Sequence, residues 1–222
     1  MLSGFVVVSV VLAAPVYIDG DATCPGAGTN DDPYCSLGDA VAQHELEPGD
    51  ELLVRDAAEP YDGERVEIVA SGTDESPLVL APDEGHSPVI QHAIRFSSGS
   101  SHWVVRDLTF DGSVATNLRA VEFSAGSSTI TDVRVENLDI RDWGAANTNG
   151  SVSYAAAIAL NAGEEGDFTD AVIRGNRITD GKGGGISTSR VDGIAVENNT
   201  IDGLSCAAGI YDADAAVVGI YA

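Results

Sequence analysis

A six-residue motif occurs four times from the middle of the chain onwards. In each copy the first, fourth and sixth residues are of the kind that faces a protein interior, and an Asp follows within two residues. The copies are VRDLTF from Val105, VENLDI from Val135, IRGNRI from Ile173 and VENNTI from Val196. Short β-branched segments between turns rich in Gly, Asp, Asn and Ser predict β-strands.

A second apolar motif precedes each copy and sets the period of the repeat. Its copies are AIRF from Ala93, AVEF from Ala120, AIAL from Ala157 and GIST from Gly185, and GIYD from Gly209 begins a fifth. Repeats of about 20–40 residues built from short strands, without helical periodicity, indicate a solenoid. We therefore predict an all-β chain that folds as a parallel β-helix, right-handed because parallel crossovers almost always are.

Stacked coils also predict columns of side chains. Asn176 and Asn199 fall at the fourth, inward position of consecutive copies, where each amide can bond the coil above or below. The second position of the four copies alternates in sign, through Arg106, Glu136, Arg174 and Glu197. Opposite charges on neighbouring strands stabilise a sheet modestly, so we assign these arginines a structural role.

The two ends of the repeat region differ. Residues 36–43, SLGDAVAQ, predict a short helix with Ser36 as N-cap, and this helix is suited to cover the apolar N-terminal end of the solenoid. The last residues, 217–222, stop in the middle of a coil. We expect residues 15–222 to form one β-helix domain that is truncated at its C-terminal end, or whose uncapped last coil associates end to end.

Residues 1–14 carry a short apolar run, Phe5–Ala14, which is too short to span a membrane. It resembles the apolar part of a secretion signal; the alternative is a first buried strand. Cys24 and Cys35 bracket a loop of Gly, Pro, Asn and Asp, and a disulfide between them is expected in an exported protein. We therefore expect a secreted or cell-surface protein, in which Cys206 is left without an assigned partner.

The charge of the chain excludes some partners. Eleven Lys and Arg residues against 35 Asp and Glu give a net charge of −24. Nucleic acid and anionic membranes are poor partners for such a chain, because both need clustered cations. No apolar run is long enough for a transmembrane segment.

The chain resembles a known superfamily over about residues 16–205. VYIDGDATCPGAGTNDDPYCSLGDAVAQ, PGDELLVR and WVVRDLTFDG are similar to the opening of right-handed β-helix proteins of the pectate-lyase-like superfamily, which share the pectin lyase fold. Within it, the opening resembles secreted polysaccharide lyases of the pectate and alginate/chondroitin type. The resemblance implies β-elimination on uronate-containing glycans, commonly with Ca²⁺ and a Lys or Arg base.

A lyase needs a base and a cation to neutralise the uronate carboxylate. Lys182, in the glycine-rich turn DGKGGG, is the candidate base, although a solvated turn lysine is the plainer interpretation. Asp142 and Asp180 are candidate Ca²⁺ ligands, or alternatively the two carboxylates of a glycosidase. The longest insertion, WGAANTNGSVSY, offers candidate substrate-binding residues: Trp143 and Tyr154 as sugar platforms, and Asn147 and Asn149 for hydroxyls.

Two functions remain open from the sequence. The first is a carbohydrate-active protein whose most concrete form is Ca²⁺-assisted β-elimination on a uronate polysaccharide. The second is a non-catalytic surface or secreted β-helix module that serves as a spacer or adhesive surface. A charge of −24 repels a polyuronate, so we expect any such activity to depend on cations. The four histidines show no ligand spacing and are assigned to surface or packing roles.

Overall fold

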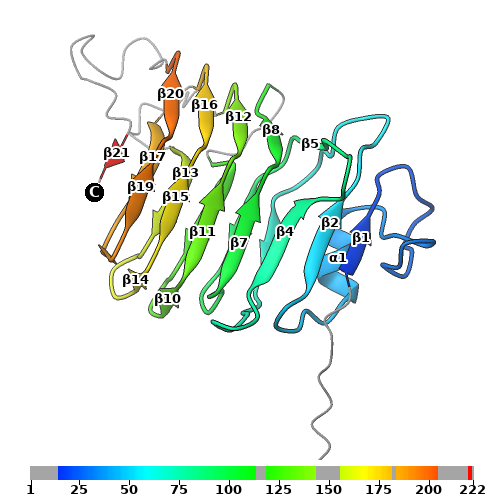
Figure 1. The fold of residues 1–222 in the computed structure, drawn as a ribbon, viewed down its shortest axis with the longest axis horizontal. Helices are drawn as coiled ribbons and strands as arrows, with labels where there is room; N and C mark the ends of the chain where they lie inside the picture. Colours follow the sequence, from blue (N-terminus) through cyan, green and yellow to red (C-terminus); the bar gives the residue numbers. More distant parts are fainter. Residues whose placement is uncertain (1–14, 114–118, 144–155, 182–183, 205–219, 222) are drawn as a thin grey trace, which may run out of the picture.

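The computed structural model is a stack of β-coils made of parallel strands (Figure 1). It describes residues 15–113, 119–143, 156–181, 184–204 and 220–221. The strands of these residues form four sheets, which we name A to D, and every strand pair between successive coils is parallel. The predicted parallel β-helix is therefore confirmed.

Sheet A contains β1 (Pro15–Ile18), β2 (Glu51–Val54), β4 (Leu78–Pro82), β7 (Trp103–Arg106), β11 (Val133–Glu136), β15 (Val172–Arg174) and β19 (Ala195–Glu197). Sheet B contains β5 (Val89–Ile90), β8 (Thr109–Asp111), β12 (Asp139–Arg141), β16 (Arg177–Thr179) and β20 (Thr200–Asp202). Sheet C contains β3 (Val66–Ile68), β6 (Ile94–Phe96), β9 (Val121–Ser124), β13 (Ala156–Asn161), β17 (Gly184–Thr188) and β21 (Ile220–Tyr221). Sheet D contains β10 (Thr129–Thr131), β14 (Asp167–Thr169) and β18 (Val191–Asp192).

Each six-residue motif is not one strand but two, which belong to sheets A and B. In the first copy β7 ends at Arg106 and β8 begins at Thr109, and the third motif residue, Asp107, lies in the left-handed region with φ 59°. The third residue of the other copies is also left-handed: Asn137, Gly175 and Asn198. Asp, Asn and Gly tolerate this conformation best. The bend explains why inward positions are spaced three residues apart and then two.

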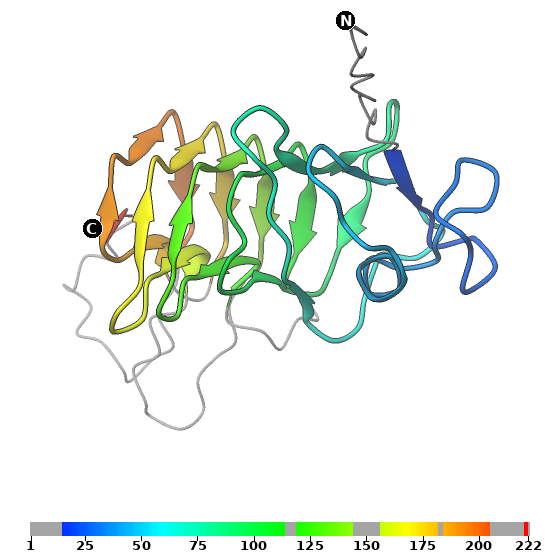
Figure 2. The same ribbon diagram turned by 90° about the horizontal axis from the view of Figure 1, so that it is seen from below.

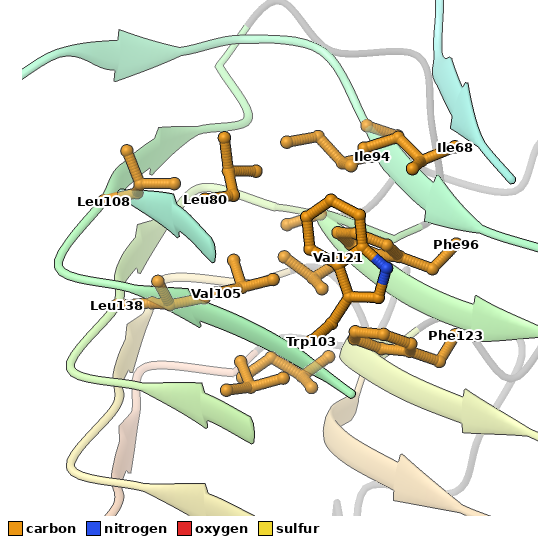
Figure 3. Close-up of a cluster of buried hydrophobic side chains, with 14 of the residues drawn as sticks. Ile68, Leu80, Ile94, Phe96, Trp103, Val105, Leu108, Val121, Phe123 and Leu138 are labelled. Atoms are coloured by element: carbon orange, nitrogen blue, oxygen red, sulfur yellow. The ribbon is translucent and has the colours of Figure 1, made fainter. Parts of the chain in front are cut away.

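The interior is filled by one continuous apolar core (Figure 3). Phe96 and Phe123, on adjacent strands of sheet C, stack with their ring centroids 4.3 Å apart. Trp103 lies against Phe96 at 4.8 Å, and its indole N–H donates to the carbonyl of Ala70. Burial of apolar surface of this kind is the main favourable contribution to folding. The aromatic cluster thereby ties sheets A and C together.

The predicted columns are confirmed by the register. Asn176 donates from Nδ2 to Oδ1 of Asn199 at 2.9 Å, and both amides also bond the backbone of neighbouring coils. On the outside of sheet A, Glu136 lies opposite both Arg106 and Arg174, and Arg174 lies opposite Glu197. The Arg174–Glu136 pair is 2.8 Å apart and partly exposed, so its net contribution is modest.

The predicted helix is α1 (Leu37–Gln43), with Ser36 as its N-cap. The Ser36 hydroxyl oxygen accepts a hydrogen bond from the amide of Asp39 at 3.0 Å. The helix contacts β1 and β3 and lies at the β1 end of the stack (Figure 1 and Figure 2). The expected disulfide joins Cys24 and Cys35, in the loop that precedes the helix.

One strand lies later than the motif predicted. Sheet C aligns Ile94, Val121, Ile158 and Ile186 as expected, and the register then pairs Ile186 with Ile220 of β21. Gly-Ile-Tyr occurs twice, at 209–211 and at 219–221, so the pattern by itself could not choose between them. Residues 205–219, including Ile210, lie outside the described residues, as do the signal-like residues 1–14.

Candidate functional site

Most of the sequence-predicted site residues belong to one kind of turn, the connection from sheet B to sheet C. In chain order these connections are residues 91–93, 112–120, 142–155, 180–183 and 203–219. From β7 onwards the connections from sheet A to sheet B have only two residues each, for example residues 107–108. Long loops on a rigid scaffold are where binding and catalytic groups concentrate. We call this series of connections the B–C turns.

Asp142 and Asp180 come to equivalent positions on adjacent coils. Both lie in the left-handed region, with φ 54° and 56°. The amide of Asp142 donates to the carbonyl of Thr179 at 3.0 Å, and that of Asp180 donates to Asp202 at 3.1 Å. Within the described residues, however, no third His, Cys or carboxylate ligand is grouped with these two. The described part of the chain therefore supplies only a fraction of a calcium shell of about six to eight oxygens.

Trp143 is buried, which speaks against a role as an exposed sugar platform. Its side chain is 2% exposed and packs edge-on against Phe110, with the ring centroids 6.0 Å apart. A sugar can stack only on an aromatic face that it can reach. The other predicted residues of these turns, Lys182, Asn147, Asn149 and Tyr154, lie outside the described residues.

Beside the B–C turns, the outward face of sheet C carries a row of charged side chains. The register places Glu67, Arg95 and Glu122 side by side on β3, β6 and β9, and we call these three the sheet C row. Glu122 is 6% exposed and accepts a hydrogen bond from Arg119 at 2.8 Å, while Nε of Arg95 lies 3.9 Å from its carboxylate. A charged group buried to this degree requires cationic partners, and the two arginines supply them.

Each of these two arginines has one N–H group without a hydrogen-bond acceptor. The Nε atoms of Arg95 and Arg119 are buried and make no hydrogen bond. The same is true of Arg141, whose Nη2 lies 3.4 Å from Asp111 at the start of a B–C turn. Buried polar groups without a partner are uncommon in folded proteins, and functional sites are one place where they occur.

Two carboxyl groups of this region have lowered pKa values. The hydroxyl of Ser97 lowers the pKa of Glu67, and Arg95 and Arg65 add to this against the effect of burial. Burial by itself raises the pKa of Asp111, but hydrogen bonds from Ser113 and the charge of Arg141 outweigh it and bring the pKa below its usual value. Both groups are therefore carboxylates at neutral pH.

A cavity of about 470 Å³ lies between α1 and the approach to β3. We call it the α1 pocket; it is lined by Ser36, Gly38, Val41, Ala42, Asp62, Glu64, Arg65, Val66, Glu67 and His92. Burial lowers the pKa of His92, and its ring is 4% exposed, so His92 is neutral at pH 7. Glu67 belongs both to the pocket and to the sheet C row, so the two are continuous.

Sequence reasoning missed the α1 pocket and assigned neither Arg95 nor Glu122 to a functional site. The signal for the row was present, because AIRF and AVEF align Arg95 with Glu122. The partner Arg119 and the burial of Glu122 were not readable, since they depend on how the turn before β9 meets the sheet.

The chain thus has the parallel β-helix fold of the pectin-lyase type, with candidate chemistry along sheet C and its turns. It is similar to the GH136 lacto-N-biosidase from Eubacterium ramulus, with a TM-score of 0.66 and 16% identity over 86% of this chain and 41% of that one. It is also similar to a rhamnogalacturonan lyase, with a TM-score of 0.58 and 14% identity over 86% of this chain and 58% of that one. The chain therefore spans well under two thirds of either protein. No family model and no curated protein matches its sequence.

Proposed function

We propose that this chain is a carbohydrate-active β-helix that binds a glycan along the α1 pocket, the sheet C row and the adjoining B–C turns. The observation that carries the proposal is the continuity of a 470 Å³ cavity with a row of charged side chains in which Nε of Arg95 makes no hydrogen bond. Sites of this size with a few convergent polar groups are the usual place for ligands. The two similar structures are a lacto-N-biosidase and a rhamnogalacturonan lyase, which agrees with a glycan ligand.

The two ends of this surface suit different sugars. The α1 pocket holds three carboxylates, Asp62, Glu64 and Glu67, which accept hydrogen bonds from neutral sugar hydroxyls. Further along, Arg95 and Arg119 suit a uronate carboxylate, because guanidinium and carboxylate pair in two parallel hydrogen bonds. Five strands of sheet C, from β3 to β17, span about 19 Å at ~4.8 Å per coil, which is room for several sugar units. A glycan with both neutral and uronate sugars fits best.

In its specific form the proposal is β-elimination at a uronate. The neutral amine of Lys182 takes the proton from C5, the electrons of that bond form the C4–C5 double bond, and the C4–O bond breaks as its oxygen takes a proton from water. Asp142 and Asp180 would hold a Ca²⁺ ion, which supplies positive charge against the uronate carboxylate when bound. Two carboxylates do not complete its shell, so water and substrate oxygens must do so.

A second candidate, a non-catalytic spacer or adhesive module, is favoured by a different observation. All ten arginines of the chain lie within 4.0 Å of a carboxylate. An arginine that is already paired must exchange its partner to bind a uronate, which costs binding energy. In this version the sheet C row holds the coils together and no bond is cleaved.

The proposal also covers the compartment in which the chain folds and the capping of its β-helix. The Cys24–Cys35 disulfide agrees with folding in an oxidising compartment, as in a secreted or surface protein. Among the described residues no helix is long and apolar enough to cross a membrane. We also propose that α1 caps the β1 end of the stack.

The test is to incubate the purified chain with pectate, rhamnogalacturonan, alginate and chondroitin, and with neutral galactosyl oligosaccharides. Ultraviolet absorbance of the unsaturated uronate reports elimination, whereas reducing ends without absorbance report hydrolysis. Lys182→Ala should abolish elimination, and chelator should do so reversibly if Ca²⁺ takes part. Arg95→Ala should weaken binding of a uronate glycan, whereas its matched control Arg174→Ala, on sheet A, should not.

The outcomes separate the candidates. Elimination that survives Lys182→Ala would show that the assigned base is wrong. Binding without bond cleavage, sensitive to Arg95→Ala, would support the non-catalytic module. Binding that is absent on every glycan, from a chain shown to be folded and β-rich, would refute the carbohydrate proposal altogether.

A further inference from the structure

Three potential metal ligands from three successive coils meet on another turn column, the one that leads into sheet A. Asp74 precedes β4, His102 precedes β7 and Asp132 precedes β11. One ligand atom from each, a carboxylate oxygen or an imidazole nitrogen, lies within 4.8 Å of the others. The column is separate from the B–C turns, which lead into sheet C.

The spacing of these atoms matches what an ion requires. Nδ1 of His102 lies 3.6 Å from Oδ2 of Asp132. Two ligands held about 2.1 Å from a tetrahedral zinc ion are ~3.4 Å apart, so this pair is already close to a ligating separation. Asp74 is exposed and reaches the pair from a turn, so its side chain is free to adjust.

The backbone fixes the two inner ligands. His102 and Asp132 are both left-handed, with φ 55° and 48°, and the amide of His102 donates to the carbonyl of Thr131 at 2.8 Å. Asp132 accepts a hydrogen bond at Oδ1 from Arg134, at 3.1 Å, which turns Oδ2 towards the imidazole. Hydrogen bonds that orient a ligand in this way are typical of metal sites.

A glycine brings the third ligand close. The amide of Gly72 donates to the carbonyl of Ser101 at 3.1 Å, which docks the turn that carries Asp74 onto the next coil. A Cβ at Gly72 would lie 2.8 Å from the carbonyl oxygen of His102 and 2.7 Å from the amide of Leu78. Only a glycine permits this approach.

The imidazole itself is the strongest indication of a ligand. Nδ1 of His102 is buried from solvent and makes no hydrogen bond, although two carboxylates lie near it. At 3.6 Å from Asp132 it is beyond hydrogen-bonding distance, so the pair does not satisfy this nitrogen. An ion between the three groups would satisfy the nitrogen and offset the negative charge of the two carboxylates.

We propose that Asp74, His102 and Asp132 bind a divalent transition-metal ion of the zinc type, which links three coils. An imidazole nitrogen with two carboxylates suits Zn²⁺, whereas Ca²⁺ prefers oxygen ligands only. Three protein ligands leave a fourth position for water. The site does not depend on the glycan proposal, because it shares no residue with the α1 pocket, the sheet C row or the B–C turns.

The experiment titrates Zn²⁺ into the chelator-stripped, disulfide-intact chain by isothermal calorimetry, with thermal unfolding measured in parallel. We expect one site per chain and a rise in the unfolding temperature. His102→Ala and Asp74→Asn should each weaken this site about 10-fold or more. The matched control is His86→Ala: His86 also pairs with a single carboxylate, Asp56, at 3.5 Å, but belongs to no group of three among the described residues.

Several results would overturn the proposal. One is the absence of a one-to-one site; another is Zn²⁺ affinity that His102→Ala leaves unchanged, since weak binding to a chain of charge −24 would not depend on one imidazole. Equal loss in His86→Ala would also contradict it. Displacement of Zn²⁺ by an equal concentration of Ca²⁺ would refute the assigned class of ion. X-ray absorption with one imidazole in the shell of the bound zinc would support it.

Discussion

The stacked asparagines offer a sharp test of how the coils are held together. Asn176 is 1% exposed. Its Oδ1 accepts from the amide of Leu138, and its Nδ2 donates to the carbonyl of Val135 and to Oδ1 of Asn199, each at 2.9 Å. The substitution Asn176→Ala removes all three bonds and puts nothing polar in their place.

The size of the effect follows from what is left behind. Leu138 and Val135 are buried, so their backbone N–H and C=O groups lose their partner without gaining water. A buried polar group left without a partner costs ~1–3 kcal/mol, so two of them cost about 2–6 kcal/mol of the free energy of unfolding. Asn199 also makes three bonds: Oδ1 accepts from the backbone amide and from Nδ2 of Asn176, and Nδ2 donates to the carbonyl of Ile173. Asn199 is only partly buried, so water can enter the space that Asn199→Ala leaves and replace these bonds. Asn199→Ala should therefore cost ~1 kcal/mol or less.

The assay is equilibrium unfolding in urea, followed by circular dichroism and tryptophan fluorescence, for the wild type and both variants. Asn176→Ala should lower the midpoint clearly more than Asn199→Ala, because burial and not the number of bonds decides the cost. Equal losses in the two variants would refute this reasoning. So would a loss below about 1 kcal/mol for Asn176→Ala, since it would mean that water or a shifted side chain reaches the buried groups.

Two further predictions concern stability. Replacing Cys24 and Cys35 together by Ser should cost about 3 kcal/mol, because the bridge closes a loop with a sequence separation of 11 and restricts the unfolded chain; urea unfolding with and without reductant measures this. Burial raises the pKa of Asp83, but hydrogen bonds from Arg55 and Glu84 outweigh it and lower the pKa overall. The stability due to this carboxylate is thus present above its unfolded pKa of about 3.9 and is lost as pH falls through the lower folded value. Asp83→Asn should therefore destabilise the chain at pH 7, and its difference from wild type should shrink below pH ~4.

Each of these predictions has its own control. Reductant should have no effect on the unfolding midpoint of the double serine variant. If reductant also left the unfolding midpoint of the wild type unchanged, the disulfide would not have the stabilising role that we assign to it. For Asp83, the comparison with the variant at each pH cancels the titration of the other acidic groups. A difference that stays constant from pH 7 to pH 2 would show that the Arg55–Asp83 pair does not stabilise through charge.

The fold could be predicted from the sequence because every coil of a solenoid repeats the same pattern of buried and exposed positions. Every coil places an apolar residue at the same positions, so Val105, Val135 and Ile173 can be aligned from the sequence and pair in the structure. Charge columns and the asparagine ladder followed from the same alignment. The division of each motif into two strands was missed, because its cause is a single left-handed residue, such as Asp107, whose conformation the apolar pattern does not encode.

The sites were less readable, because each depends on contacts between residues far apart in the sequence. The sequence directed attention to Trp143 as a surface aromatic, and the structure buries it against Phe110. It assigned His102 no ligand role, since Asp74 and Asp132 lie 28 and 30 positions away along the chain. Residues that are one full coil apart in the sequence come into contact only when the turns of successive coils stack on one another.

The sequence by itself therefore determined the repeat, the parallel β-helix, the N-capped helix and the disulfide, all of which rest on local pattern or on spacing between neighbouring copies. Only the tertiary structure decided which polar groups are buried and which meet. Burial sets the cost of an unpaired group such as Nδ1 of His102 or Nε of Arg95, and it is a property of the whole stack. The α1 pocket likewise exists only because α1 folds back against the first coils, at a position that no single segment specifies.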